Sequence, residues 1–477
     1  DGRVAAGYPA HPEGALARTH YIIGRDGGET PKPDREALEA GIVAIARNWG
    51  DRLSDALDEA IGGSRARDLA TRYGAAFGPD YRDAYDVEAA VSDIGRLEQL
   101  SEARPRALDF YQREDDAPER VGLKLFSLGQ SLELSDRVPL LERMGFRVVN
   151  ERTYHLYPSD DPDEPTVWLH DMKLERASGE AVDVPTLDAP IEAALLAVFR
   201  GIAESDTYNK LVLEAGLGWR DAALLRSFGR YLQQLTIPFG QSYLADVLAR
   251  HGAFARALVR LFYARFEPSL DEAARDSRAG EARAAIDEHL AGVSSLDEDR
   301  ILRRFANLVE AALRTNFFRI GKDGLPSNII AFKFDCARVE GMPKPRPLFE
   351  IFLTSPRVEG LHLRFGKVAR GGLRWTDRPL DFRTEVLGLV KAQQVKNAVI
   401  VPVGAKGGFF PKQLPPASDR AAWLAEGTEA YRLFIGTLLD LTDNIEGDTI
   451  VPPPETVRHD PDDPYLVVAA DKGTATF

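Results

Sequence analysis

The hydrophobic pattern of the 477-residue chain changes its period several times. Between residues 31 and 103 apolar residues recur every three or four positions, which is typical of helices with one buried face. One such face carries Ile42, Ile45, Trp49, Leu53 and Leu57. Asp34 is placed to cap this helix and Gly62-Gly63 to end it, so the pattern predicts one helix between them. Residues 1–30 contain a short predicted strand, Tyr21 to Ile23, and we expect them to end an upstream domain.

Over residues 104–185 the period changes to two, which predicts strands. The predicted strands cover residues 121–126, 146–157 and 166–174. The predicted helices cover residues 136–144, capped by Ser135, and residues 191–202. The order β-α-β-β-α favours a ferredoxin-like α+β sandwich. This order resembles that of an ACT domain, a module that is often used for regulation by amino acids.

Helical spacing returns over residues 186–325, where an apolar stripe predicts a supporting bundle. The stripe consists of Leu224, Leu225, Phe228, Leu232 and Leu235. Later strands are predicted at residues 329–334, 348–354, 358–365, 399–403 and 466–470, with a helix at 386–395. Helices that alternate with apolar strands indicate an α/β domain over residues 326–477. The predicted fold is therefore multi-domain, α+β and α/β, with helical segments between the two types of domain.

The composition is that of a globular chain, because 44% of the residues are hydrophobic. No apolar run approaches the ~20 residues of a membrane helix, and no signal peptide is recognisable. A single cysteine, Cys336, excludes an internal disulfide and a cysteine-cluster metal site, and it suits a reducing cytoplasm. The formal net charge of −14 argues against general nucleic-acid binding. The chain starts at Asp1 and stops after an apolar run, so we expect a piece of a longer polypeptide.

One stretch departs from this acidity, and we call residues 355–412 the basic island. It contains 11 Lys and Arg against 4 Asp and Glu, together with two Gly-Gly pairs. Lys406 lies among glycines at residues 404–408, directly after the predicted strand 399–403. Glycines let a backbone approach a ligand, and a lysine in such a loop can exchange protons or polarise a carbonyl. A surface lysine in a hairpin explains the same motif equally well.

Other residues of this part of the chain suit a small anion as well. Gln393 and Lys396 are three residues apart on the predicted helix and therefore share a face. Arg370 precedes Gly371-Gly372, where the guanidinium and backbone N–H groups can bind a carboxylate. Asp471 ends the last predicted strand, and ligand sites in α/β folds lie at strand ends. The structural alternatives are a solvated helix face, a Gly-rich turn and a helix cap.

The combination of motifs is more specific than its parts. RGGLRW at 370–375, QQVKNA at 393–398 and VPVGAKGG at 401–408, followed by a strand-end Asp, resemble the substrate domain of glutamate dehydrogenases. The surrounding sequence is most similar to the large NAD-dependent class of that family. The resemblance implies a long N-terminal region with ACT-like and helical parts, which residues 1–325 fit. Residues 326–477 would then be the first half of the substrate domain.

The same resemblance implies roles for individual residues. Arg370 takes the place of the lysine that binds a substrate carboxylate, and Gln393 and Lys396 match substrate-binding positions on a helix. Gly372 matches a backbone contact to the substrate. Together, the two cations favour a dicarboxylate, so that L-glutamate and 2-oxoglutarate are the expected substrates.

Two catalytic residues are implied in addition. Lys406 resembles the catalytic lysine, and Asp471 the aspartate that transfers protons, although Glu455 competes for that second role. The implied reaction is the oxidative deamination of L-glutamate to 2-oxoglutarate and ammonium, with NAD as the cofactor. The motif G-x-G-x-x-G is absent, so we expect the dinucleotide domain beyond Phe477 and no turnover by this segment alone.

Two other functions remain open. One is a regulatory segment without activity of its own, in which an ACT-like domain binds amino-acid effectors and the helices assemble a homo-oligomer. The other is a related amino-acid dehydrogenase, which would share the Gly-rich lysine motif but would not need a cation for a side-chain carboxylate.

Overall fold

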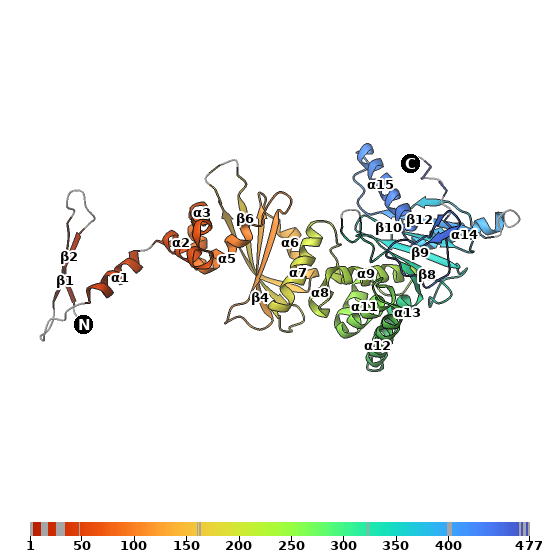
Figure 1. Ribbon diagram of the computed structural model, residues 1–477, viewed down its shortest axis with the longest axis horizontal. Coiled ribbons are helices and arrows are strands. Elements are labelled where there is room, and N and C mark those ends of the chain that lie inside the picture. The colour runs from red at the N-terminus through yellow and green to blue at the C-terminus, as the bar shows by residue number, and fades with distance from the viewer. Residues whose placement is uncertain are drawn as a thin grey trace. The chain divides into compact units, whose positions relative to one another are not determined.

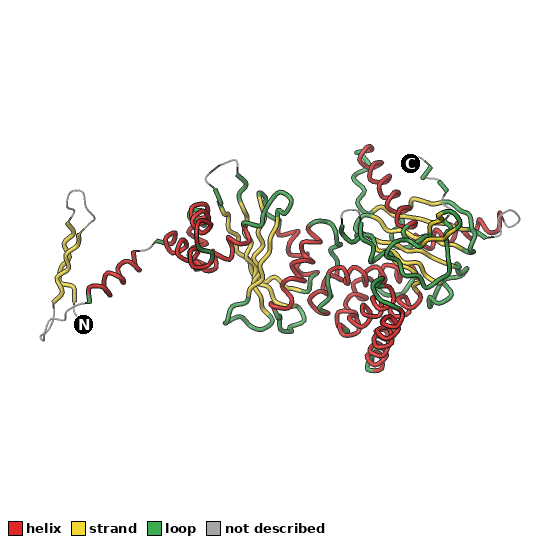
Figure 2. Tube along the Cα trace, in the orientation of Figure 1, coloured by secondary structure: helices red, strands yellow, loops and turns green. Residues whose placement is uncertain are grey.

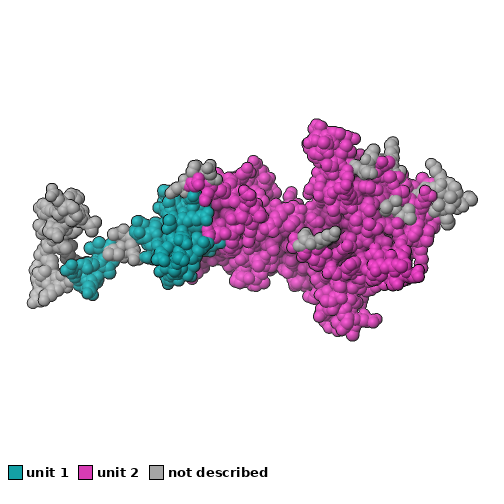
Figure 3. Space-filling view, turned by 45° about the horizontal axis from the view of Figure 1, so that its top comes forward, with its two compact units in different colours: residues 1–95, 157–159 teal, residues 96–156, 160–477 magenta. Residues whose placement is uncertain are grey.

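The computed structural model describes residues 3–10, 18–24, 34–46, 48–159, 161, 164–321, 324–397, 403–466, 469–470 and 474–475. These residues form two compact units (Figure 3). Unit 1 comprises residues 1–95 with 157–159, and unit 2 comprises residues 96–156 with 160–477. Unit 2 includes several of the five predicted segments and does not separate them from one another. The boundaries of these segments therefore stay predictions.

Unit 1 begins with two antiparallel strands, followed by helices (Figure 1). The strands are β1 (Arg3–Ala10) and β2 (Arg18–Gly24). The helices are α1 (Arg35–Ala46), α2 (Trp49–Ala60), α3 (Gly63–Tyr73), α4 (Pro79–Ala84) and α5 (Val87–Leu97). The predicted strand at Tyr21 to Ile23 lies within β2 and is confirmed.

The prediction of one helix between Asp34 and Gly62 is wrong, because two helices cover this stretch. The Asp34 cap exists, since the Ala37 N–H donates to its carboxylate at 3.1 Å. A second cap follows at Asn48, whose side chain accepts from the Asp51 N–H at 2.9 Å while its own N–H donates to the Asp51 carboxylate. This capping box starts a new helix, and such a cap contributes about 1 kcal/mol.

The apolar stripe is buried after this break but exposed before it, at Ile42. Trp49, Leu53 and Leu57 are buried on α2, whereas Ile42 on α1 is 63% exposed. Residues on either side of the break therefore do not share a buried face, although their spacing is that of one helix.

The predicted β-α-β-β-α order is confirmed in unit 2. Its elements are β3 (Arg106–Tyr111), β4 (Arg120–Leu128), α6 (Leu134–Arg143), β5 (Phe146–Leu156), β6 (Val167–Arg176) and α7 (Val184–Phe199). The strands form an antiparallel sheet in the order β3-β4-β6-β5. Two details differ from the prediction: β3 adds an edge strand before the motif, and Ser135 lies inside α6, which is preceded by Glu133 as its N-cap.

The middle of unit 2 is the predicted helical bundle. It comprises the 3-10 helix η1 (Thr207–Asn209) and helices α8 (Lys210–Ala215), α9 (Trp219–Gln234), α10 (Gln241–Arg250), α11 (Gly252–Phe266), α12 (Glu272–Ala291) and α13 (Leu296–Ala311). The predicted apolar stripe on α9 is confirmed, because its side chains are at most 3% exposed.

A mixed sheet completes unit 2 (Figure 2). Its strands are β7 (Ala312–Thr315), β8 (Ile330–Asp335), β9 (Phe349–Thr354), β10 (Val358–Arg364), β11 (Leu373–Trp375) and β12 (Ala405–Pro411), in the order β11-β12-β10-β9-β8-β7. The pairing of β11 with β12 is parallel and the other pairings are antiparallel. Helices α14 (Phe382–Asn397) and α15 (Arg420–Leu439) and the hairpin of β13 (Asn444–Glu446) and β14 (Thr449–Val451) accompany it.

Different helices cover the two faces of this sheet. Leu361 and Leu363 of β10 join a core with Phe382 of α14, whereas Val358 of the same strand joins a second core with Phe434 of α15. Helices α9, α13 and α14 contact the first face and α15 the second. Side chains on a strand alternate between faces, so this arrangement decides which helix each residue of the basic island meets.

Candidate functional site

The structure brings together three of the predicted motifs at the β11 edge of the sheet. Arg370 and Gly404 form a parallel bridge, and the Ala405 N–H donates to the Arg370 carbonyl at 3.0 Å. The Gly407 N–H reaches the Gly372 carbonyl at 3.3 Å. On the other side of β11, the Leu373 N–H donates to the Ala469 carbonyl at 3.0 Å. Segments that are far apart in the sequence thus lie side by side.

The glycines of these motifs have a steric explanation. A Cβ at Gly371 would lie 1.3 Å from the Ala405 carbonyl oxygen. A Cβ at Gly407 would lie 2.5 Å from a methyl carbon of Leu373. Because real Cβ atoms do not approach other heavy atoms so closely, glycine is what lets the two motifs pack backbone against backbone.

Lys406 lies on strand β12 and not in the expected loop. It is half-buried and pairs with Leu363 of β10. Gly408, two residues on, shares its face, and a Cβ there would lie 2.7 Å from a methyl group of Val386 on α14. Lys406 therefore belongs to the face that α14 covers. Of the predicted strand 399–403, residues 399–402 lie outside the described residues, and the described strand starts at Ala405.

Helix α14 carries Gln393 and Lys396, whose side chains lie outside the described residues. The first turns of the helix are fixed to the sheet by a buried ion pair. Arg383 donates to both carboxylate oxygens of Glu350 on β9, at 2.9 and 2.8 Å, and its N–H donates to Gln234 of α9 at 3.1 Å. Both charged side chains are at most 1% exposed. The helix predicted for residues 386–395 is confirmed and begins one turn earlier.

Asp471 lies outside the described residues, but the nearest described residues before and after it, Ala470 and Thr474, both contact Leu373. Ala470 forms a parallel bridge with Leu373, and the buried Thr474 hydroxyl donates to the Leu373 carbonyl at 3.0 Å. The competing Glu455 accepts a hydrogen bond from the Ile320 N–H at 2.8 Å.

Sequence reasoning missed one residue that orients the site. Glu385 of α14 forms an ion pair with Arg374 at 2.9 Å and accepts from the Thr376 hydroxyl at 2.7 Å. Arg374 belongs to the same motif as Arg370, so Glu385 ties β11 to α14. No periodicity relates Arg374 to Glu385, and the single available signal is the opposite charge of the two residues.

Another residue that sequence reasoning missed is a buried histidine behind the Gly-rich strand. His362 of β10 pairs with Gly407 of β12, is 3% exposed, and its Nε2 has no hydrogen-bond partner among the described residues. Burial and the nearby Arg364 guanidinium lower the pKa of His362 to about 4. The imidazole is therefore neutral at physiological pH.

The segment that leads to Ala469 is anchored by buried charges. Three cations of the sheet bind three aspartates of this part of the chain: Arg314 contacts Asp443 and Asp460, Lys333 contacts Asp460 and Asp463, and Arg364 contacts Asp463. The Tyr465 hydroxyl also donates to the Ala369 carbonyl at 3.0 Å. These contacts hold the segment against the sheet as far as Tyr465, shortly before the residues that contact β11.

The described ranges contain neither a candidate metal cluster nor a candidate membrane span. Within them, no group of three or more His, Cys, Asp and Glu residues is arranged to hold a metal ion. None of the helices in the described part of the chain is both long and apolar enough to cross a bilayer.

Five family models match consecutive parts of the chain. "Bacterial NAD-glutamate dehydrogenase, catalytic domain" matches residues 285–477. The others are domains of glutamate dehydrogenase: ACT2 at residues 1–50, helical motif 2 at 56–100, ACT3 at 105–187 and helical motif 3 at 203–268. The ACT3 match covers the four strands β3–β6 and helix α6 and ends at the start of α7, and the catalytic match covers the three motifs that meet at β11.

Curated relatives agree with these models. The chain is 45% identical to proteins named NAD-specific glutamate dehydrogenase from Halomonas elongata and Pseudomonas aeruginosa, each over 98% of its length. It is 43% identical over 94% of its length to the protein of that name from Mycobacterium tuberculosis. The chain spans 28% to 29% of the length of these relatives. It therefore belongs, as a segment, to the bacterial NAD-dependent glutamate dehydrogenase family.

Proposed function

We propose that this chain supplies the substrate half of the active site of an NAD-dependent glutamate dehydrogenase. The enzyme would convert L-glutamate, NAD+ and water into 2-oxoglutarate, ammonium, NADH and a proton. The observation that carries the proposal is the meeting of Arg370–Leu373, Gly404–Gly407 and Ala469–Ala470 at β11, with α14 against the face that holds Lys406.

The proposed roles follow from charge and position. Arg370 and Lys396 would bind the two carboxylates of glutamate, with Gln393 and the Gly372 backbone as further contacts. Lys406 would stabilise the oxyanion that develops when water adds to the imine carbon. Its half-buried position suits this role, because a cation acts more strongly where water is excluded.

For proton transfer we propose Asp471, supported by the contacts of Ala470 and Thr474 with Leu373. It would accept a proton from the substrate ammonium and return one to the leaving amine. Glu455 already accepts a hydrogen bond from the Ile320 N–H, and this supports the choice of Asp471 over Glu455.

NAD, when bound, accepts the hydride from the substrate carbon. The chain contains no strand followed by G-x-G-x-x-G, so its residues do not fit a dinucleotide site of that type. We propose that other residues of the full-length polypeptide bind the nucleotide.

The proposal is tested by Lys406→Ala in the full-length polypeptide that contains these residues. We expect kcat to fall on the order of 10²- to 10³-fold, as when one donor to an oxyanion is removed, with the melting temperature little changed. The matched control is Lys391→Ala, which removes an exposed lysine of α14 and should leave turnover intact. Unaltered turnover by Lys406→Ala would contradict the assignment.

A second function is supported by the ACT3 match at residues 105–187. We propose that this region binds amino-acid effectors and that the helical segments assemble a homo-oligomer. If the chain served regulation alone, Lys406→Ala would change neither turnover nor assembly. The single buried Cys336 suits a reducing compartment, and we propose the cytoplasm.

A related amino-acid dehydrogenase is the remaining alternative. Arg370 and Lys396 favour a substrate with two carboxylates. A comparison of kcat/KM for L-glutamate and L-leucine decides between them, and a preference for L-leucine would exclude a glutamate dehydrogenase.

A further inference from the structure

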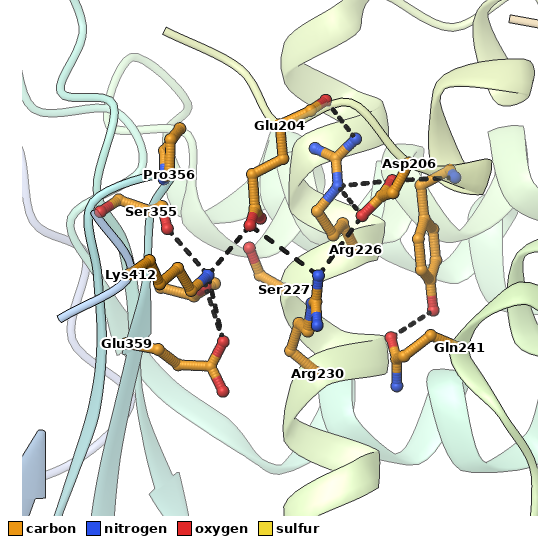
Figure 4. Close-up of polar contacts among 12 residues, drawn as sticks. Glu204, Asp206, Arg226, Ser227, Arg230, Gln241, Ser355, Pro356, Glu359 and Lys412 are labelled. Carbon is orange, nitrogen blue, oxygen red and sulfur yellow. Dashed lines mark hydrogen bonds and ion pairs between the residues drawn. The ribbon is translucent and has the colours of Figure 1, made fainter. Parts of the chain in front are cut away.

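Lys412, the last residue of the basic island, plays no part in the proposed chemistry, yet its ammonium group is almost fully bonded. Its Nζ donates to the Glu204 carboxylate and the Thr354 hydroxyl at 3.1 Å each and to the Ser355 carbonyl at 2.8 Å. A second carboxylate, that of Glu359, lies 3.2 Å away (Figure 4). The side chain is 13% exposed, so this lysine bonds to groups inside the protein and is not a solvated surface residue.

Glu204, a partner of Lys412, also lies beside a second set of charges on the helical side. Arg226 of α9 donates to both carboxylate oxygens of Asp206 at 2.9 Å, and Arg230 lies 3.8 Å from Glu204 and 3.6 Å from Asp206 (Figure 4). Burial alone would raise the pKa of Glu204, but Lys412 and the two arginines lower it below its ordinary value. With Glu359, three carboxylates balance three cations.

The two sides of this cluster belong to different parts of unit 2. Arg226 and Arg230 come from α9 and Glu204 from the segment before η1, whereas Lys412 follows β12 of the sheet. Lys412 therefore connects the sheet to the acidic segment at residues 204–206 through its bond to Glu204. The family model of helical motif 3 covers that segment, and the catalytic model covers Lys412.

Lys406 and Lys412 lie near opposite ends of the same strand. They are six residues apart, so alternation places both on the face that α9 and α14 cover. At about 3.3 Å per residue they are separated by roughly 20 Å along an extended and inextensible backbone. A small lengthwise shift at Lys412 would therefore reach Lys406 almost undiminished.

We propose that Lys412 is a positioning residue, whose bonds to Glu204 and Glu359 fix β12 lengthwise and thereby set the place of Lys406. The position of β12 then depends on the acidic segment at residues 204–206. The inference rests on the proposed function for its effect on turnover, but not for its effect on the strand itself.

The test compares Lys412→Met and Glu204→Gln with Lys210→Met in the full-length polypeptide. Lys210→Met removes a lysine of α8 that is bonded to Asp246 within the bundle, and it controls for the loss of a lysine ion pair away from the sheet. Three quantities are measured on folded protein: kcat, KM for glutamate, and hydrogen exchange at the amides of Ala405 and Gly407. These amides bind the Arg370 and Gly372 carbonyls, so they report the position of β12 directly.

We expect Lys412→Met to lower kcat by on the order of 10- to 100-fold with KM changed by less than about threefold, because misplacement of a catalytic group affects the transition state most. Glu204→Gln should lower kcat less, and both variants should speed exchange at the two amides. Lys210→Met should resemble the wild type in all three quantities.

The proposal is overturned if Lys412→Met folds with wild-type kcat and wild-type exchange. Should Lys412→Met fail to fold, Glu204→Gln decides alone by the same two readouts. A wild-type protein that does not oxidise glutamate refutes the proposed function, whereas hydrogen exchange still decides the role of Lys412. A variant with faster exchange but unchanged kcat overturns the link between the strand and catalysis.

Discussion

Single residues explain why the motifs at β11 require glycine. Replacing Gly371 by Ala would place a Cβ 1.3 Å from the Ala405 carbonyl oxygen, so the two backbones must separate. We expect the free energy of unfolding to fall by about 3 kcal/mol or more, as for overpacking that moves a backbone. Urea unfolding measures the change.

The control for this prediction is Gly436→Ala on α15, where a new Cβ meets nothing within 4 Å. Because alanine favours a helix over glycine, this variant should be more stable by about 0.5–1 kcal/mol. Equal stability of Gly371→Ala and the wild type would mean that the backbones at β11 are not in close contact.

His362 makes the stability depend on pH. Its pKa is about 4 in the folded protein and 6.5 ordinarily, so the unfolded chain takes up the proton first as the pH falls. The neutral imidazole thus contributes stability that is fully present above pH 6.5 and is lost as the pH falls toward 4. The difference corresponds to about 3 kcal/mol.

Denaturant unfolding between pH 7.5 and pH 4.5 tests this dependence. His362→Leu should lose less stability over this range than the wild type, because it has no imidazole to protonate. Identical pH slopes for the two proteins would refute the role of His362. The charged groups near this residue, Arg364 and its partner Asp463, are the same in both.

At the level of residues, the sequence was sufficient to name Arg370, Gly372 and Lys406 as candidates, because their motifs are contiguous, and their roles stay predictions. It was not sufficient to place Lys406 on a strand, since apolar spacing around glycines does not distinguish a strand from a loop. The contact between Glu385 and Arg374 could not be predicted from the sequence either, because tertiary packing brings the two residues together.

At the level of elements, we expect the buried charges of the six-stranded sheet to matter most for its stability. Asp443 is fully buried and accepts from Arg314 at 2.8 and 3.1 Å and from the Asp463 N–H at 2.6 Å. Asp443→Ala removes one of the two carboxylates that neutralise the buried Arg314 guanidinium and leaves Arg458 without this partner. We expect a loss of about 3–5 kcal/mol in the free energy of unfolding.

Asp299→Ala is the matched control for this change. It removes an aspartate that pairs with Arg303 one turn away on the exposed side of α13, and it should cost less than about 0.5 kcal/mol. Thermal or urea unfolding compares the two variants. A loss as small as that of the control would show that the buried cluster does not hold the segment in place.

Elements with a regular apolar stripe could be predicted from the sequence, as α9 and the β4–β6 region show. The break between α1 and α2 could not, because the stripe continues across it and the local capping box of Asn48 and Asp51 decides. The anchoring of the segment after β14 was also not predictable. Its ion pairs with the strands of the sheet join residues 99 to 146 positions apart, such as Arg314 and Asp460.

On the scale of the whole molecule, one apolar core connects most of unit 2. It extends from Leu108 in β3 through the helical bundle to Leu387 in α14, and none of its described residues comes from unit 1. We therefore expect residues 96–477 to unfold in one cooperative transition without residues 1–95.

Calorimetry of this fragment tests the expectation. Two resolved transitions, or a loss of near-UV circular dichroism, would contradict a common core. The full chain is the reference, and its main transition should coincide with that of the fragment.

If Gln393 and Lys396 bind the substrate as proposed, helix α14 offers a practical route to altered substrate preference. Its first turns are fixed by the ion pair of Arg383 with Glu350 and by the packing of Phe382 and Val386, whereas Gln393 and Lys396 lie in its last turns. Directed evolution can therefore treat the first half as a fixed scaffold and confine its libraries to the second half. Such libraries would sample new specificities while most variants keep a folded sheet.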